Sequence, residues 1–121
     1  MKTQILKSVN LPWKFHEKHY LTCDLYYDAG GYNWYNKAEE PRGYYISVCR
    51  SVEQVAGIIS VFPTSGVKES IITCKRRTGK QDTKAIVMFA DKVKRIISLA
   101  FPDMDIDYTG LDTTVGEERA A

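Results

Sequence analysis

Two histidines and a cysteine within eight positions, His16, His19 and Cys23, are the residues best suited to bind a metal. A zinc site needs three or four ligands that converge tetrahedrally on one ion. In a strand, His19 and Cys23 share a face, but their Cα atoms are about 13 Å apart. We therefore expect no metal site, and we interpret both histidines as surface or strand-edge residues.

Three acidic residues near the C-terminus, Asp103, Asp105 and Asp107, resemble the beginning of a calcium-binding loop. The EF-hand motif then requires glycine at its sixth position and glutamate at its twelfth. Tyr108 and Thr114 occupy those positions. The match fails where the geometry of the loop requires it, and the pattern indicates an acidic tail.

Motifs for catalysis are missing from the sequence. The pair Gly30-Gly31 has neither of the glycine spacings that cradle phosphates. A catalytic nucleophile must lie beside a base, and nothing in the sequence pairs a cysteine with a histidine. The carboxylates Glu39-Glu40 fall in a polar segment and indicate solvated charge. We predict no catalytic residue, no cofactor and no enzyme activity.

A run of cations lies near the middle of the second half of the chain. It contains Lys75, Arg76, Arg77 and Lys80, with Lys84 beyond it. Clustered lysine and arginine neutralise nucleic-acid phosphates and release counterions. Two alternative roles for this run stay open. It could end a helix, where cations stabilise the negative end of the dipole, or it could face an acidic protein surface, including the tail of this chain.

Aromatic residues gather in and beside one long connection. They are Tyr26, Tyr27, Tyr32, Trp34, Tyr35, Tyr44 and Tyr45. Such side chains suit interfaces and can stack on unpaired bases, although several of them could simply pack the connection onto a sheet. The candidate binding surface joins this loop to the basic run and consists of Lys75, Arg76, Arg77, Lys80, Lys84, Tyr32, Trp34, Tyr35 and Arg42.

The composition is typical of one globular domain. The 121 residues are 44% hydrophobic and 26% charged, which is ordinary for a folded protein. No apolar run approaches the roughly 20 residues of a membrane helix, and the N-terminus lacks the apolar stretch of a signal peptide. Cys23, Cys49 and Cys74 are few and far apart, which favours free thiols. We expect a cytoplasmic protein without membrane partners.

The net charge of +2 is unevenly distributed along the chain. Residues 64–100 carry nine cationic and three acidic side chains, whereas residues 101–121 carry one and six. A basic segment is therefore followed by an acidic tail that could mask it electrostatically.

Strands are predicted in the first half of the chain. Four segments have strand character: residues 4–9, 19–27, 44–52 and 57–62. The second and third alternate apolar and polar side chains with a period of two, whereas Pro12 and Pro63 should end the first and the last. The connection formed by residues 28–43 is long for a hairpin, and such loops are often functional.

Helices are predicted in the second half. Over residues 82–100 apolar side chains recur every three or four positions, which predicts an amphipathic helix capped by Asp82 or Thr83. Residues 65–78 are ambiguous, because their apolar spacing is helical while Ile71-Ile72-Thr73 is a β-branched run. We favour a helix there.

Together these elements predict an α+β fold. A small antiparallel sheet of three to four strands in the N-terminal half is packed by one or two C-terminal helices. Residues 1–102 form a single domain, and residues 103–121 form an acidic, flexible tail.

Three short runs carry a resemblance to known proteins. Tyr27–Asn33, Glu40–Val48 and Ser65–Lys68, followed by a lysine-rich segment, are similar to a group of short uncharacterised proteins from gut bacteria and their phages or mobile elements. The group has no established activity, so the resemblance implies no catalytic residue. It implies a helix after Ser65-Gly66 and an accessory role in the biology of a mobile element.

Our leading hypothesis from the sequence is a small non-enzymatic binding protein. It would contact nucleic acid through the basic region, residues 75–84, and the aromatic loop, residues 26–45. The alternative is a protein–protein interaction module or a homodimer that uses the aromatic loop and an edge of the sheet.

Overall fold

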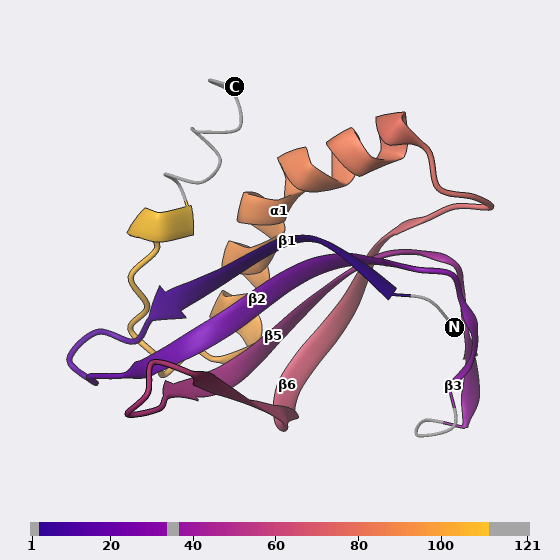
Figure 1. The fold of residues 1–121 in the computed structure, drawn as a ribbon. Helices are drawn as coiled ribbons and strands as arrows, with labels where there is room; N and C mark the ends of the chain where they lie inside the picture. The colour runs from indigo at the N-terminus through magenta and orange to yellow at the C-terminus, as the bar shows by residue number, and fades with distance from the viewer. Residues whose placement is uncertain (1–2, 34–36, 112–121) are drawn as a thin grey trace.

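An antiparallel sheet forms the N-terminal half of the molecule. The computed structural model describes residues 3–33 and 37–111, and its four long strands lie in the order β1-β2-β5-β6 (Figure 1). The first three are β1 (Thr3–Pro12), β2 (His19–Asp28) and β5 (Gly43–Glu53). They confirm the strands predicted at residues 4–9, 19–27 and 44–52, except that β1 continues to Pro12. The α+β class is confirmed.

Alternation along the strands gives the sheet one apolar face. Leu21, Cys23 and Leu25 of β2 are fully buried, and Cys23 and Leu25 pair with Val48 and Ile46 of β5. Successive side chains of a strand point to opposite faces. The core therefore lies between this face and the helix, and the polar residues of the same strands occupy the other face.

The last strand is much longer than predicted. β6 (Ile59–Thr73) continues through Pro63, where we expected it to end. The ladder with β5 is irregular at this point, because residues 63–66 lie between the partners of Val48 and Arg50. A proline removes a ladder hydrogen bond only where the ladder is regular, and bulges tolerate it.

Residues 65–78 are not a helix, which corrects both our preference and the implication of the resemblance. β6 occupies this segment as far as Thr73 and pairs antiparallel with β5. The β-branched run Ile71-Ile72-Thr73 suits a pleated surface better than a helix. The basic run that follows therefore does not end a helix at residues 65–78, and Lys75, Arg76 and Arg77 lie in a connection after β6.

The long connection between β2 and β5 also contains regular structure. β3 (Gly31–Asn33) and β4 (Ala38–Glu40) pair antiparallel and form a small hairpin beyond the ends of the two long strands. Asp28 is buried and accepts a hydrogen bond of 2.8 Å from the amide of Gly30. Gly30 has a φ of 83°, a left-handed conformation that glycine adopts without strain.

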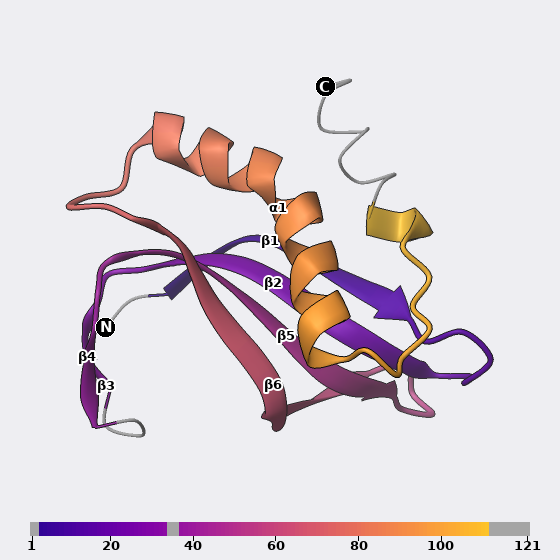
Figure 2. The ribbon, with the colours of Figure 1, turned by 180° about the vertical axis from the view of Figure 1, so that it is seen from behind.

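One long helix covers the apolar face of the sheet (Figure 2). α1 (Gly79–Ala100) buries one stripe against it: Ala85, Phe89, Val93, Ile96 and Ile97. The hydroxyl of Thr78 accepts a hydrogen bond from the Gln81 amide and caps the helix, so the caps predicted at Asp82 or Thr83 are wrong. In the described part of the chain, no helix has the length and apolar character needed to cross a membrane.

The chain beyond α1 returns to the sheet. Ile106 and Leu111 are buried in the core, and Ile106 forms an antiparallel bridge with Trp13. The flexible tail that we predicted from residue 103 is thus packed structure as far as Leu111. Residues 112–121 of the predicted tail lie outside the described residues.

Candidate functional site

The candidate site lies at the end of the sheet where two connections meet. The small hairpin formed by β3 and β4 and the segment 74–78 before α1 are on the same side of the molecule in both Figure 1 and Figure 2. Arg42 joins them. Its Nε donates to the carbonyl of Ala29 at 3.0 Å, and its Nη1 donates to the carbonyl of Lys75 at 2.9 Å. The start of the aromatic loop is thus tied to the start of the basic run, whereas β3 and β4 extend away from the N-terminus of α1 in both views.

The basic run occupies the first turn of α1 and the connection before it. Lys75, Arg76, Lys80 and Lys84 are exposed, and none of them forms an ion pair within residues 3–33 and 37–111. The positive end of a helix dipole is its N-terminus. The run therefore adds its charge to that end and does not neutralise a helix C-terminus, which rules out one of the two alternative roles.

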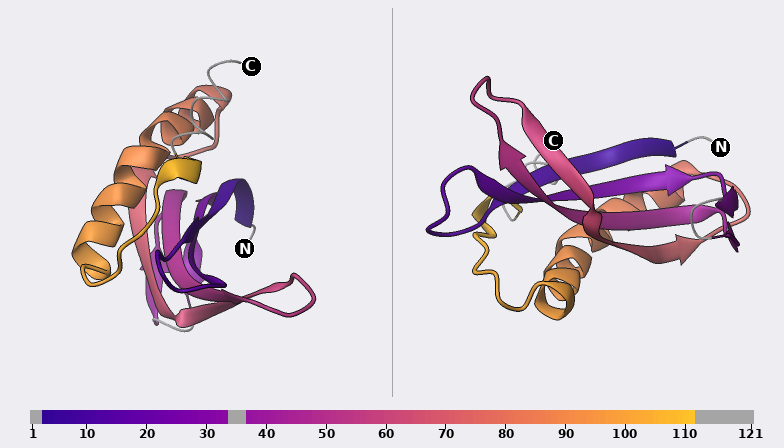
Figure 3. Two further views of the ribbon diagram at one scale, coloured as in Figure 1. Left: turned by 90° about the vertical axis from the view of Figure 1, so that its left-hand side faces the viewer. Right: turned by 90° about the horizontal axis from the view of Figure 1, so that it is seen from below.

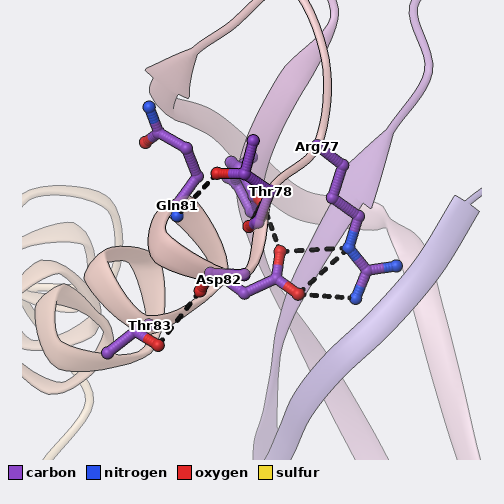
Figure 4. A network of polar contacts seen from close by, with 7 residues as sticks. Arg77, Thr78, Gln81, Asp82 and Thr83 are labelled. Atoms are coloured by element: carbon purple, nitrogen blue, oxygen red, sulfur yellow. Dashed lines mark hydrogen bonds and ion pairs between the residues drawn. The ribbon is translucent and has the colours of Figure 1, made fainter.

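Arg77 has a different role from the other cations. It binds Asp82 through two nitrogens, with Nε–Oδ1 and Nη2–Oδ2 distances of 3.0 and 2.8 Å (Figure 4). Asp82 also accepts a hydrogen bond from the hydroxyl of Tyr44. Arg77 additionally lies 5.8 Å from the ring centre of Tyr27. This predicted binding residue is consequently a structural tie between α1 and the sheet.

The charges in this network are held fixed. The hydrogen bonds from Arg77, and then that from Tyr44, hold the pKa of Asp82 below its usual value. The hydrogen bond to Asp82 raises the pKa of Arg77, whereas burial and then Asp82 raise the pKa of Tyr44. Each shift moves the pKa of its group further from 7. Asp82 and Arg77 therefore stay charged and Tyr44 stays protonated near pH 7, and none of the three is suited to exchange a proton there.

Most tyrosines near the site are packing residues. Tyr27 and Tyr44 are buried, with ring centres 5.3 Å apart, on the helix-covered face. Tyr26 and Tyr45 stack at 5.8 Å on the other face. These four rings are thus fixed parts of the sheet and not free stacking platforms.

Tyr32 is the predicted aromatic contact that reaches solvent, because 39% of its surface is exposed on β3. Trp34 and Tyr35, which we also predicted to contact a ligand, lie outside the described residues. Apart from Arg77, the predicted binding residues that the structure describes are all exposed: Arg42, Lys75, Arg76, Lys80, Lys84 and Tyr32. We call these six residues the basic end.

A cation outside the predicted set lies on the other face of the sheet. Lys68 is 4.7 Å from the ring centre of Tyr45 and forms a 2.8 Å ion pair with Glu40. The sequence suggested that Glu40 was merely solvated, because the pairing of β6 with β5 was not predicted in this region. The ion pair makes Lys68 a part of the sheet surface and not of the basic end.

The two histidines lie at the opposite end of the sheet. His16 stacks on Trp13 with ring centres 3.7 Å apart, and His19 lies edge-on to Trp13 at 5.9 Å. No group of three or more candidate ligands is placed to hold a metal within the described ranges.

Burial raises the pKa of both Cys23 and Cys49, so these thiols are poor nucleophiles at neutral pH.

Sequence reasoning missed an exposed apolar surface at this opposite end. Phe15, at the turn between β1 and β2, is 94% exposed and has a φ of 67°. Residues 54–62, around the turn between β5 and β6, expose several more apolar side chains. A signal was present, because residues 54–67 contain no charged residue.

The chain was compared with protein-family models, curated proteins and solved structures. None of the three comparisons gives a match. Any functional conclusion for this chain therefore depends on the contacts and charges of its own residues.

Proposed function

We propose that this protein binds nucleic acid, without sequence specificity, through the basic end. The observation that carries the proposal is the placement of four exposed cations, Lys75, Arg76, Lys80 and Lys84, around the N-terminus of α1. The positive end of a helix attracts anions, and clustered cations strengthen that field. A polyanion with regularly spaced phosphates fits such a surface better than a single small anion does.

The geometry of Arg42 supports the same proposal. Its two hydrogen bonds to backbone carbonyls tie Ala29, just before the small hairpin, to Lys75 at the start of the basic run. Tyr32 lies on β3 of this hairpin and is 39% exposed, so a strand that runs from the cations along the hairpin would also meet its ring. Cations beside an aromatic side chain are the usual elements of single-strand binding, because phosphates meet the charges while a base stacks on the ring. We expect single strands to bind more tightly than duplexes.

The described part of the acidic tail does not compete for this surface. Asp105 lies 3.8 Å from Lys14, beside the turn between β1 and β2. The amide of Asp107 donates to the carbonyl of Pro12 at 2.9 Å. These contacts hold the start of the tail at the end of the sheet remote from the basic end.

The test is the binding of a labelled mixed-sequence oligonucleotide, measured by fluorescence anisotropy over a range of salt concentrations. Each phosphate contact to a single strand contributes about 0.7 to the slope of log affinity against log salt. The double variant Arg76→Gln/Lys80→Gln should bind more weakly and lower this slope by about 1.4. Tyr32→Ala should weaken single-strand binding and leave duplex binding unchanged.

A matched control removes one arginine and one lysine elsewhere on the same helix. Arg95→Gln/Lys92→Gln lowers the net charge equally but alters the C-terminal half of α1. It should leave the slope nearly unchanged. If both double variants weaken binding equally, the effect is one of net charge, and the proposed surface is wrong.

A further inference from the structure

The turn between β5 and β6 extends away from the body of the molecule. Both views in Figure 3 show this hairpin projecting beyond the other strands. We call residues 54–62 the apolar arm. Its strand portion, Ile59–Phe62, pairs with β5 on one side, and β6 is the edge strand of the sheet within the described residues. The outer backbone groups of this portion are thus available to another strand.

Apolar side chains are exposed all around the arm. Val55 and Ile58 near the turn are 98% and 66% exposed, and Val61 and Phe62 in the strand are 43% and 45% exposed. Val61 and Phe62 are successive residues, so they point to opposite faces of the sheet. A partner that extended the sheet along its edge would cover both faces, whereas a partner docked on one face would cover only one side chain.

The arm also lacks the charges that normally protect an edge strand. Natural edge strands carry lysine or other charged residues that prevent pairing with another chain. Residues 54–67 are the longest stretch without a charged side chain in a protein whose residues are 26% charged. Pro63 gives some protection, but it follows the four residues of the strand portion and does not interrupt them.

We propose that Ile59–Phe62 pairs antiparallel with the same segment of a second copy, which joins two sheets into one across a two-fold axis. A closed symmetric interface brings identical surfaces together. A surface with any charge would therefore meet its own sign, and this stretch avoids that repulsion. An anionic lipid surface is a poorer occupant, because lipid-binding segments carry clustered cations and this stretch has none.

The direction of β6 fits this arrangement. The strand runs from the apolar arm at Ile59 to the basic run after Thr73. In an antiparallel pair of identical strands, each chain runs outward from the axis. The two basic ends are thereby placed at opposite extremes of the dimer, where their like charges repel least.

The test is the mass of the protein in solution, measured by light scattering and sedimentation over a wide concentration range. The wild-type chain should reach twice its monomer mass of 13.8 kDa. Val61→Lys and Phe62→Lys should each weaken association at least about tenfold, because each places a charge without a partner in an apolar interface. The milder Val61→Thr retains β-branching and should weaken association by a smaller factor.

Two control variants place the same charge on exposed apolar residues of α1. Val87→Lys and Leu99→Lys replace side chains that are 70% and 72% exposed, and they should leave the dimer intact. Circular dichroism would establish that every variant is folded. The proposal is overturned if the wild-type chain is monomeric at all concentrations. It is also overturned if the dimer survives both lysine variants of the arm, or if self-association appears only with phosphatidylserine vesicles.

Discussion

The two ends of the sheet are built in opposite ways. At the basic end, side chains fix the backbone: Arg42 binds two carbonyls, and Asp82 binds both Arg77 and Tyr44. At the other end, the turns are fixed by backbone hydrogen bonds, such as that from Glu53 to Lys18, while apolar side chains project into solvent. Side-chain contacts therefore hold the backbone that carries the exposed cations, whereas the apolar surface lacks a cover within the described structure.

The largest loss of stability should come from a substitution at the point where the backbones of β5 and β6 approach each other closely. A Cβ atom on Gly43 would collide with the carbonyl of Ile72 on β6. Gly43→Ala must push the two strands apart, which should cost about 3 kcal/mol of unfolding free energy. Urea unfolding measures the loss.

Gly79→Ala is the control for that variant. Nothing lies within 4 Å of a Cβ atom at Gly79, in the first turn of α1. Alanine should be neutral there or stabilise by about 0.5 kcal/mol. If the two alanine variants unfold at the same urea concentration, the close approach of β5 and β6 does not matter to stability.

The next largest loss of stability should come from truncating a core residue near the β1–β2 turn, at the end of the sheet remote from the basic end. Ile106 is 4% exposed and bridges Trp13 at the start of the β1–β2 turn. Ile106→Ala should lose about 2–3 kcal/mol, because it removes buried methyl groups and leaves a cavity. The same truncation at Val55, which is 98% exposed, should change stability by less than about 0.5 kcal/mol. If both truncations cost the same free energy of unfolding, burial of Ile106 adds nothing to stability. The segment after α1 would then not be part of the core.

A smaller effect separates charge from packing at the basic end. Asp82→Asn removes a partly exposed ion pair and should cost about 1 kcal/mol at neutral pH. Because the folded pKa of Asp82 is lowered from its ordinary 3.8, this contribution is complete above that value and is lost as the pH falls through the lower folded pKa. Urea unfolding at pH 7 and under strongly acidic conditions should give a gap between wild type and variant that closes in acid. If the difference in unfolding free energy between wild type and variant is the same at both pH values, the loss comes from altered packing or hydrogen bonding and not from the charge of Asp82.

The smallest effect is an expected gain in stability at the turn between β1 and β2. Phe15 has a left-handed backbone and its side chain is 94% exposed, so its conformational strain is offset by little burial. Phe15→Gly should relieve that strain and raise the unfolding free energy by about 0.5 kcal/mol after the entropy of glycine is subtracted. Thermal unfolding would detect it. A loss of stability would mean that the ring makes contacts that stabilise the turn.

The sequence predicted those elements whose periodicity was undisturbed. Alternation at residues 19–27 and the three–four spacing at residues 82–100 both identified real elements, because each buries one face. The irregular ladder at Pro63 has no periodic signal, so β6 was cut short in the prediction. Mistaking residues 65–78 for a helix then placed the basic run at the wrong end of a helix.

The candidate site was predictable as a set of residues but not as an arrangement. The clustering of cations along the sequence identified Lys75, Arg76, Lys80 and Lys84. The tie between Arg42 and Lys75 depends on the pairing of β5 with β6, which the sequence does not reveal. Arg77 was assigned to the surface because nothing in the sequence indicates that Asp82 lies within reach of its guanidinium group.

The bridge between Trp13 and Ile106 has a consequence for the order of folding. It joins positions 93 residues apart, so it cannot form until Ile106 has been synthesised. Loop closure over that distance carries a large entropy cost, although the cost grows slowly with length. Strand pairs between neighbours in the sequence can form earlier. Trp13, the one tryptophan in the described structure, should therefore report the final docking of the chain as a late change in fluorescence during refolding.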